Sequence, residues 1–342
     1  MRVLMPSRIL DRPTGGNTTY ARHIAAGLES NGIEVERIAA GNHPGSTMVI
    51  ETLAGLRRGN AQDILHYVAD TGPLVRTRRA SVVTVHGVAS RWIKQARTSR
   101  QESIWRTRVK RAIESTDRII TVSASSARDI ESVFGVNADR ITVIEHGVDV
   151  DRFSQRTTVS PELAAQLPSN YVLYLGNIEP RKNLVELVRA FDAPELRGLD
   201  IKLVVAGRPA WNSDEIVRQI DASDRAIRLG YVSDRDRVAL MQSASLFAFP
   251  SLYEGFGFPV LEALAAGAVV LTSNRGSLAE VAGPALRFTS LEADGMVHDI
   301  AAALTETESR DGCRSAGLTW ASRFTWDASV RQHVKLYEEL IR

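Results

Sequence analysis

Short apolar segments alternate with longer amphipathic segments along almost the whole chain. The short segments are rich in Val, Ile and Leu, which favour strands, and the longer ones space their apolar residues as helices do. The strand candidates are Val3–Met5, Ile64–Val68, Val82–His86, Arg118–Val122, Ile141–Glu145, Tyr171–Leu175, Ile201–Ala206, Ile227–Leu229, Leu246–Phe249 and Val269–Thr272. The helix candidates include Thr18–Ser30, Ser125–Phe134, Leu184–Phe191, Arg235–Gln242 and Val260–Ala266. This alternation predicts parallel sheets covered by helices on both faces.

The pattern restarts near the middle of the chain, which indicates two domains. Residues 154–170 carry two prolines and no strand-like run, and residues 171–176 repeat the order of strand and glycine turn seen at the N-terminus. We therefore expect an α/β fold of two doubly wound, Rossmann-like domains facing each other across a cleft. The expected limits are 1–156 for the first domain, 157–170 for a linker and 171–325 for the second domain, with a C-terminal helix at 326–342 packing back towards the first domain.

Composition excludes several classes of protein. The net charge of +2 argues against a dedicated nucleic-acid binder, although residues 1–160 hold 23 Lys and Arg against 16 Asp and Glu. Cys313 is the only cysteine, so an intrachain disulfide is excluded and a reducing compartment is indicated. No run approaches the roughly 18 apolar residues of a membrane-spanning helix. We expect a cytoplasmic protein.

Two turns that follow strands suit a phosphate group. Gly15 and Gly16 lie between the first strand and a helix, where small residues let backbone approach a ligand, although a plain tight turn explains them equally well. Arg181 and Lys182 lie where a helix begins, at the positive end of its dipole. Two cations placed against that field indicate an anion, and a diphosphate fits their chemistry.

Two glutamates lie on either side of a Gly-Phe-Gly-Phe-Pro loop. Pro259 suits the first turn of a helix, which places Glu262 on that helix, whereas Glu254 precedes the loop. The two carboxylates therefore do not form an adjacent acid–base pair by helical spacing. We expect them to contact different parts of one elongated ligand.

These features occur together in one known family. The chain resembles the retaining, nucleotide-sugar-dependent glycosyltransferases of family 4, which have the GT-B fold, and especially bacterial mannosyl- and rhamnosyltransferases of polysaccharide biosynthesis. The resemblance rests on the spacing of Glu254 and Glu262 and on landmarks in the same order along almost the whole chain. These are Gly15-Gly16, residues 84–87 (TVHG), 122–125 (VSAS), 145–149 (EHGVD) with Phe153, 180–183 (PRKN), 206–208 (AGR), 229–232 (LGYV) and 276–280 (GSLAE).

The resemblance implies a role for each matching residue. Arg181 and Lys182 match the cations that bind the donor diphosphate, Glu262 matches the glutamate that accepts from ribose hydroxyls, and Glu254 matches the one that reaches the transferred sugar. The resemblance implies further donor-binding residues. Tyr231 and Val232 frame the base, and the others are Gly15 and Gly16 in the first glycine turn and Gly255, Phe256, Gly257 and Phe258 beside Glu254.

His86 matches a histidine on the acceptor side. Many relatives continue with Asp where this chain has Gly87, and most have Pro in place of Ala279. The change at Gly87 puts the details of sugar contact in question, whereas the change at Ala279 is minor.

The implied reaction is transfer of a hexose with retention at the anomeric carbon, from a nucleotide sugar to a glycan or a lipid-linked acceptor. Front-face attack needs no enzymic nucleophile, and double displacement through Glu254 is the alternative. A non-catalytic nucleotide-sugar-binding protein and a GT-B-fold epimerase are the other functions compatible with the fold. The likeness to mannosyltransferases favours a GDP-sugar over a UDP- or dTDP-sugar as co-substrate, and no other cofactor is expected.

Two Asp-x-Asp triplets raise the question of a metal ion. They are Asp149-Val150-Asp151, which follows the His-Gly-Val-Asp landmark of the family, and Asp234-Arg235-Asp236, which lies where a helix is expected to begin, a position that favours Asp as a cap. We interpret both as structural and expect no metal.

Residues 76–111 form a basic segment. They hold 11 basic residues and one acidic residue, with Trp92 and Trp105 among them. A solvated helix with its aromatic residues in the core accounts for any single position. Taken together, the segment favours contact with an anionic membrane surface or a phosphate-bearing acceptor. We expect peripheral contact at the inner face of the cell membrane.

Overall fold

The computed structural model describes residues 1–93 and 99–341, and the chain divides into two compact units. The first unit comprises Met1–Gly147 and Phe324–Arg342, and the second comprises Val148–Arg323. The division after Gly147 lies nine residues before the expected domain end at residue 156, and the stretch expected as a linker belongs to the second unit. Residues 326–341 belong to the first unit.

The first unit contains a six-stranded parallel sheet in the order β2-β1-β3-β4-β5-β6. Its strands are β1 (Arg2–Pro6), β2 (Glu34–Ile38), β3 (Asp63–Tyr67), β4 (Ala80–Thr84), β5 (Arg118–Thr121) and β6 (Ile141–Val143). Its helices are α1 (Ser7–Leu10), α2 (Gly16–Ser30), α3 (Pro44–Leu56), α4 (Ser99–Ser115), α5 (Ala124–Phe134) and α16 (Trp326–Ile341), with 3₁₀ turns at Ala89–Arg91 and Ala138–Arg140.

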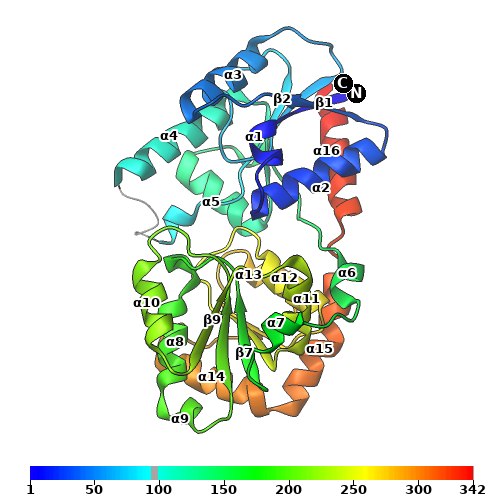
Figure 1. The fold of residues 1–342 in the computed structure, drawn as a ribbon. Coiled ribbons are helices and arrows are strands. Elements are labelled where there is room, and N and C mark those ends of the chain that lie inside the picture. The colour runs from blue at the N-terminus through cyan, green and yellow to red at the C-terminus, as the bar shows by residue number, and fades with distance from the viewer. Residues whose placement is uncertain (94–98, 342) are drawn as a thin grey trace. The chain divides into compact units, whose positions relative to one another are not determined.

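The second unit contains a six-stranded parallel sheet in the order β12-β11-β10-β7-β8-β9 (Figure 1). Its strands are β7 (Tyr171–Leu175), β8 (Lys202–Ala206), β9 (Ala226–Gly230), β10 (Leu246–Phe249), β11 (Val270–Thr272) and β12 (Leu286–Arg287). Its helices are α6 (Val150–Ser154), α7 (Pro161–Ala164), α8 (Leu184–Asp192), α9 (Pro194–Arg197), α10 (Asp214–Ala222), α11 (Asp234–Ser243), α12 (Phe258–Ala265), α13 (Leu278–Val281), α14 (Ala293–Thr305) and α15 (Thr307–Ala321), with a 3₁₀ turn at Pro180–Lys182.

The prediction of doubly wound parallel sheets is confirmed, and each of the ten predicted strands overlaps an observed one. Two edge strands were missed. Strand β2 has three charged residues out of five and buries only Ile38, and β12 has two residues. An edge strand packs on fewer neighbours than a central one, so its sequence carries a weaker apolar signal.

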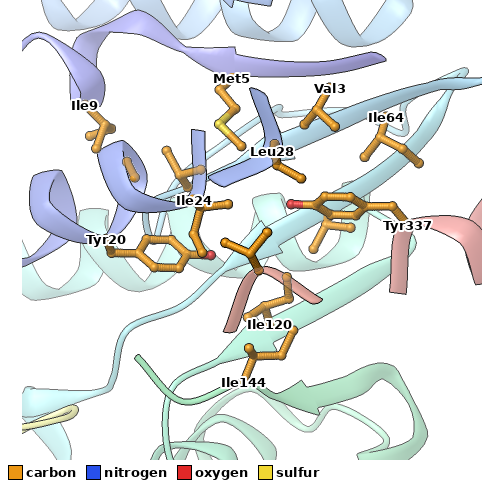
Figure 2. Packing of buried hydrophobic residues seen from close by; sticks show 14 of the residues in the cluster. Val3, Met5, Ile9, Tyr20, Ile24, Leu28, Ile64, Ile120, Ile144 and Tyr337 are labelled. Atoms are coloured by element: carbon orange, nitrogen blue, oxygen red, sulfur yellow. The ribbon is translucent and has the colours of Figure 1, made fainter. Parts of the chain in front are cut away.

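In the first unit, helix α16 packs against α2 and contacts β3 and β4. Tyr20 from α2 and Tyr337 from α16 lie among aliphatic side chains such as Ile24, Leu28 and Ile64 (Figure 2). The aromatic rings contribute apolar area, but their hydroxyl groups are buried with them and need partners.

A chain of buried hydrogen bonds meets this need and ties α16 to the sheet. Tyr337 Oη lies 2.7 Å from His66 Nδ1, and His66 Nε2 lies 2.8 Å from Thr84 Oγ1. Thr84 Oγ1 lies 2.9 Å from Tyr20 Oη, which lies 2.8 Å from His333 Nε2. His333 Nδ1 ends the chain 2.7 Å from the carbonyl oxygen of Ser329.

The carbonyl group of Ser329 determines which atom donates in each hydrogen bond of this chain. Because an oxygen of this kind only accepts, His333 Nδ1 carries a proton and a neutral His333 accepts at Nε2 from Tyr20. The same reasoning makes Thr84 donate to Tyr20, His66 donate from Nε2 to Thr84, and Tyr337 donate to His66. Both histidines are satisfied only when neutral. Burial lowers the pKa of His66 well below its ordinary value and lowers that of His333 to about 4.

We expect the free energy of unfolding to fall as the pH drops from about 6.5 towards 4. A histidine whose pKa is depressed in the folded state stabilises the fold above the unfolded-state pKa of about 6.5, because below it the unfolded chain binds more protons. The loss amounts to as much as about 1.4 kcal/mol per pH unit for each such histidine. Urea unfolding at stepped pH measures the slope.

His333→Gln should make this slope shallower, whereas His298→Gln, which changes an exposed histidine in the second unit, should leave it unchanged. A slope unaffected by His333→Gln would contradict the assignment. Carboxylates begin to bind protons in the unfolded chain below about pH 5.5 and add to the slope there, so the slopes are compared between about pH 6.5 and 5.5.

Candidate functional site

The central residues of the site lie where the strand order of the second sheet reverses. Strands β7 and β10 are neighbours at the middle of that sheet, and their chains lead to helices on opposite sides of the reversal. In open α/β sheets, ligands bind beside the carboxyl ends of the strands at such a reversal. Arg181 and Lys182 follow β7, and Glu254 follows β10.

Arg181 and Lys182 lie in the 3₁₀ turn Pro180–Lys182, immediately before α8, whose start at Leu184 agrees with the helix predicted from the sequence. Asn183 ends this turn in the left-handed conformation, with φ of 59°, and α8 begins at the next residue. The amide of Asn183 donates to the carbonyl oxygen of Leu291 at 2.8 Å, which anchors the turn. Both cations are thereby held just ahead of a helix N-terminus.

Glu254 contacts both cations. Its Oε2 lies 2.7 Å from Arg181 Nη1, and its Oε1 lies 2.5 Å from Lys182 Nζ. The hydroxyl of Ser251 also donates to Oε1, at 2.6 Å. On the other side of the guanidinium, Arg181 Nε lies 2.5 Å from Oε1 of Glu179. The ammonium of Lys182 also lies 4.7 Å from the centre of the Phe249 ring.

The electrostatics of this cluster are those of buried ion pairs. Burial alone would raise the pKa of Glu254, but Arg181 and Lys182 outweigh it and hold this pKa at about 2. Burial and the neighbouring Arg181 lower the pKa of Lys182, against the opposing effect of Glu254. Arg181 keeps a raised pKa, because Glu254 and Glu179 outweigh its own burial. At neutral pH the carboxylate of Glu254 and the guanidinium of Arg181 are charged.

The loop after Glu254 is held by Ser277. The backbone N–H and the hydroxyl of Ser277 both donate to the carbonyl oxygen of Glu254, at 3.3 and 3.0 Å, and the hydroxyl also lies 2.8 Å from the carbonyl oxygen of Phe256. Gly257 caps α12 with φ of 102°, a conformation that favours glycine. These contacts fix where α12 begins.

Glu262 lies on α12 with a different partner, as the sequence predicted when it separated the two glutamates. Its Oε1 lies 3.3 Å from Nη1 of Arg237 on α11, and the Arg237 guanidinium lies 5.3 Å from the ring centre of Phe153. Burial raises the pKa of Glu262, and Arg237 opposes that rise. The Asp-x-Asp triplets have structural partners: Asp149 caps α6, Asp234 pairs with Arg152, and Asp236 accepts from Ser233, the cap of α11.

The other predicted donor-side residues of the second unit follow β9 or surround the loop. Tyr231 is exposed and its ring lies 4.2 Å from the guanidinium of Arg208, while Val232 is half-buried beside it. Phe256 is buried and meets Phe258 edge to face at 5.3 Å, and Gly255 joins Phe256 to Glu254.

Gly15, Gly16 and His86 lie in the first unit. Gly15 caps α2 with φ of 128°, and Gly16 begins that helix. His86 follows β4; its backbone N–H donates to Asp70 at 2.9 Å, and its Nε2 donates to the carbonyl oxygen of Val68 at 3.1 Å. The ring of His86 lies edge-on to that of Tyr20.

Sequence reasoning missed Glu179, Ser251, Ser277, Arg208 and Arg237 as parts of the site. Glu179 could have been predicted from the sequence, because a carboxylate two residues from a basic pair is a common ion-pair partner. Ser277, Arg208 and Arg237 lie more than 20 residues from their partners, and Ser251 lies only three residues before Glu254, but no local pattern marks any of the four.

Many charges of the basic segment are paired within the first unit. Arg91 lies 3.3 Å from Asp129, to which the Trp92 indole also donates at 2.8 Å, and Arg106 lies 2.5 Å from Glu102. Trp105 packs on Phe134. Residues 94–98 lie outside the described part of the chain, and membrane contact stays a prediction. None of the described helices combines the length and apolar character required to cross a bilayer.

Two family models match the chain side by side. The model described as Glycosyltransferase Family 4 matches residues 48–152, and the model described as Glycosyl transferases group 1 matches residues 155–320. The chain belongs to the family 4 glycosyltransferases. This family has the GT-B fold, and all of the landmarks that carried the resemblance fall inside the two matched ranges except Gly15-Gly16, which precede them, and Phe153, which lies between them.

Three curated relatives of this family 4 chain are mannosyltransferases by name. O-antigen chain mannosyltransferase B of Escherichia coli is 32% identical over 67% of the chain and 62% of the relative. MMP alpha-(1->4)-mannosyltransferase of Mycolicibacterium hassiacum is 27% identical over 79% and 64%. GDP-mannose:cellobiosyl-diphosphopolyprenol alpha-mannosyltransferase of Komagataeibacter xylinus is 27% identical over 91% and 79%. The matches thus span less than two thirds of the length of the first two relatives.

Solved structures show the same fold over the whole chain. Sucrose-phosphate synthase of Thermosynechococcus elongatus superposes with a TM-score of 0.78 at 18% identity and covers 99% of each chain. Anabaena HepE in complex with UDP-glucose superposes with a TM-score of 0.73 at 17% identity and covers 99% of this chain and 100% of its own. These likenesses bear on the GT-B fold alone.

Glu254→Gln should lower the free energy of unfolding by about 3 kcal/mol, because the change leaves buried Lys182 and the adjacent Arg181 without their shared counter-charge. Urea unfolding at pH 7 measures the loss. The matched control is Glu195→Gln, which removes an exposed carboxylate from the same unit and should change stability by less than about 0.5 kcal/mol. Equal stability of the two variants would show that the buried pairs contribute nothing to the fold.

Proposed function

We propose that this chain transfers a hexose, mannose or a close relative, from a nucleotide sugar to a glycan or lipid-linked acceptor, with retention at the anomeric carbon. The observation that carries the proposal is the cluster of Arg181, Lys182 and Glu254 at the switch point of the second sheet. Two cations and a carboxylate at this edge suit a diphosphate joined to a sugar. The names of the curated relatives support mannose as the sugar.

The chemistry follows from where charge develops. As the bond between the anomeric carbon and the diphosphate oxygen breaks, its electron pair remains on that oxygen, and negative charge grows on the diphosphate. Arg181 and Lys182 stabilise this charge more than they stabilise the bound donor, which lowers the barrier. The acceptor hydroxyl attacks from the same face, and the leaving oxygen takes its proton. Double displacement through Glu254 is the alternative route.

The remaining residues orient the donor or line the acceptor side. Arg237 favours the charged form of Glu262 against the effect of burial, and a carboxylate in that form accepts from both hydroxyls of a ribose. Tyr231, stacked on Arg208, offers a flat exposed ring beside the base. His86, donating through Nε2 to Val68, presents Nδ1 as an acceptor when neutral, which suits a sugar hydroxyl. Its pKa is lowered by burial, against the opposing charge of Asp70, so that the neutral form dominates at pH 7.

No step in this route calls for a metal ion, since the two cations take the part that a divalent ion plays at a diphosphate. Within residues 1–93 and 99–341, no group of three or more His, Cys, Asp or Glu side chains is placed to hold a metal. Metal independence stays a prediction of the proposed mechanism. Cell-surface polysaccharide or glycolipid biosynthesis, and attachment to the inner face of the membrane, belong to the same proposal.

Lys182→Ala and Glu254→Gln should each lower the rate of sugar transfer by two orders of magnitude or more, since each removes a group that acts on the diphosphate or the sugar. The measurement is release of nucleoside diphosphate in the presence of acceptor extracts. Lys202→Ala, a change on β8 outside the site, is the control. Unchanged rates in both site variants would overturn the roles assigned to Lys182 and Glu254, whereas no release by the wild type would favour a non-catalytic nucleotide-sugar-binding protein.

Calorimetric titration should give the tightest binding with GDP, followed by UDP and dTDP. The name of the Komagataeibacter relative contains GDP-mannose, which supports this order. Transfer should continue in excess EDTA, and the product should keep the anomeric configuration of the donor by NMR. Inversion of configuration would rule out the front-face mechanism, and tightest binding of UDP would redirect the donor assignment.

A further inference from the structure

The two cations that suit a diphosphate already share an anion. Each oxygen of Glu254 contacts one of them: Oε2 lies 2.7 Å from Arg181 Nη1, and Oε1 lies 2.5 Å from Lys182 Nζ. A carboxylate that bridges two cations through its two oxygens has the geometry of a phosphate group that does the same. In this structure Glu254 therefore holds the position that the phosphate needs.

Glu179 completes the balance of charge. It contacts Arg181 at Nε, 2.5 Å from its Oε1, and leaves the other side of the guanidinium to Glu254. The two carboxylates match the charges of Arg181 and Lys182. The site therefore has no net positive charge to attract a diphosphate, unless one of the two carboxylates moves away from the cations.

Because the cations are buried, a diphosphate must replace a carboxylate on them and cannot bind beside it. Lys182 is 4% exposed and Glu254 is 6% exposed, so neither tolerates the loss of its partner without a replacement. A diphosphate and the Glu254 carboxylate cannot both contact the same two donors, because two anions repel each other strongly at a buried site that water screens little. The carboxylate leaves only when an anion of equal or greater charge arrives.

Glu254 is the carboxylate that can move. Glu179 directly precedes the 3₁₀ turn, and its carbonyl oxygen accepts from the backbone N–H of Lys182 at 3.0 Å, so it is part of the frame that carries the cations. Glu254 belongs to a different loop. Ser277 fixes its backbone carbonyl, which leaves rotation of the side chain as the simplest movement.

We propose that the Glu254 carboxylate occupies the phosphate position on Arg181 and Lys182 in the free protein, and that the diphosphate of a nucleotide or nucleotide sugar displaces it. This inference rests on the proposed function. The displaced carboxylate becomes an acceptor for a hydroxyl of the transferred sugar. Recognition of the sugar then depends on prior occupation of the cations, because Glu254 is not released by a sugar or a nucleoside alone.

The test compares the affinity of GDP, UDP and dTDP for the wild type and three variants by calorimetry. Glu254→Gln removes the competing charge and should bind the preferred diphosphate at least tenfold more tightly than the wild type, although it has lost transfer. Glu254→Asp keeps the charge but is too short to bridge both cations, and should bind about threefold more tightly or better. Glu179→Gln removes an equal charge from the frame and should not bind more tightly.

Each result bears on the proposal in one direction. Equal or weaker binding by Glu254→Gln and Glu254→Asp overturns it, and so does an equal gain in Glu179→Gln, which would reduce the effect to net charge. Guanosine, which carries no phosphate, should bind the wild type and Glu254→Gln alike. If the wild type and Glu254→Gln bind none of the three diphosphates, the proposed function fails and this inference with it, whereas wild-type binding without a gain contradicts the inference alone.

The stability of the variants provides a second measurement. Glu254→Gln should unfold at a lower temperature than the wild type without ligand, and inorganic pyrophosphate should raise its unfolding temperature by more than it raises that of the wild type. An equal rise in both proteins would contradict the displacement. This comparison holds even when the variant is less stable, because each protein is its own reference.

Discussion

The ion pairs between Glu254 and the Arg181–Lys182 turn connect the two central loops of the second unit. One loop follows β7 and the other follows β10, and these strands are neighbours where the strand order reverses. The pairs are buried, so their geometry is enforced by the cost of leaving a charge without a partner. Three further hydrogen bonds join the same two loops. The hydroxyl of Ser251 and the backbone N–H of Leu252 donate to the carbonyl oxygen of Arg181, and Arg181 Nη1 donates to the carbonyl oxygen of Tyr253. The stability of the second unit and the chemistry of its site therefore depend on the same charges.

Much of the fold was accessible from the sequence, because parallel strands buried on both faces are continuous apolar runs. Residues 171–175 and 246–249 are clear examples, and both are completely or almost completely buried. The chemical character of the cation pair was also accessible, since adjacent Arg181 and Lys182 near a helix start are unfavourable without an anion. The separation of Glu254 from Glu262 followed from proline and glycine, whose backbone preferences are local.

The partners of these residues were not accessible, because pairing is a property of the folded chain. Sequence reasoning left both cations to a ligand, whereas the structure gives them Glu254 and Glu179. Tyr20 and His333 are 313 residues apart and share one hydrogen bond. Their types carry no signal of that contact, since a buried tyrosine or histidine has many ways to satisfy its polar atoms. The strand β2 was missed for a different reason: its exposed residues are charged, so it lacks a continuous apolar run.

The hydrogen-bonded chain through α16 has a consequence for synthesis. The first unit includes residues 1–147, yet Tyr337 and His333, which satisfy His66 and Tyr20, are translated only after the whole of the second unit. The second unit is one continuous stretch and can fold while residues 1–147 wait on the ribosome. At about 5–20 residues per second, that wait lasts on the order of 10–40 s. During it, buried positions of the nascent sheet are open to chaperones. The unit whose synthesis begins first is therefore the one completed last.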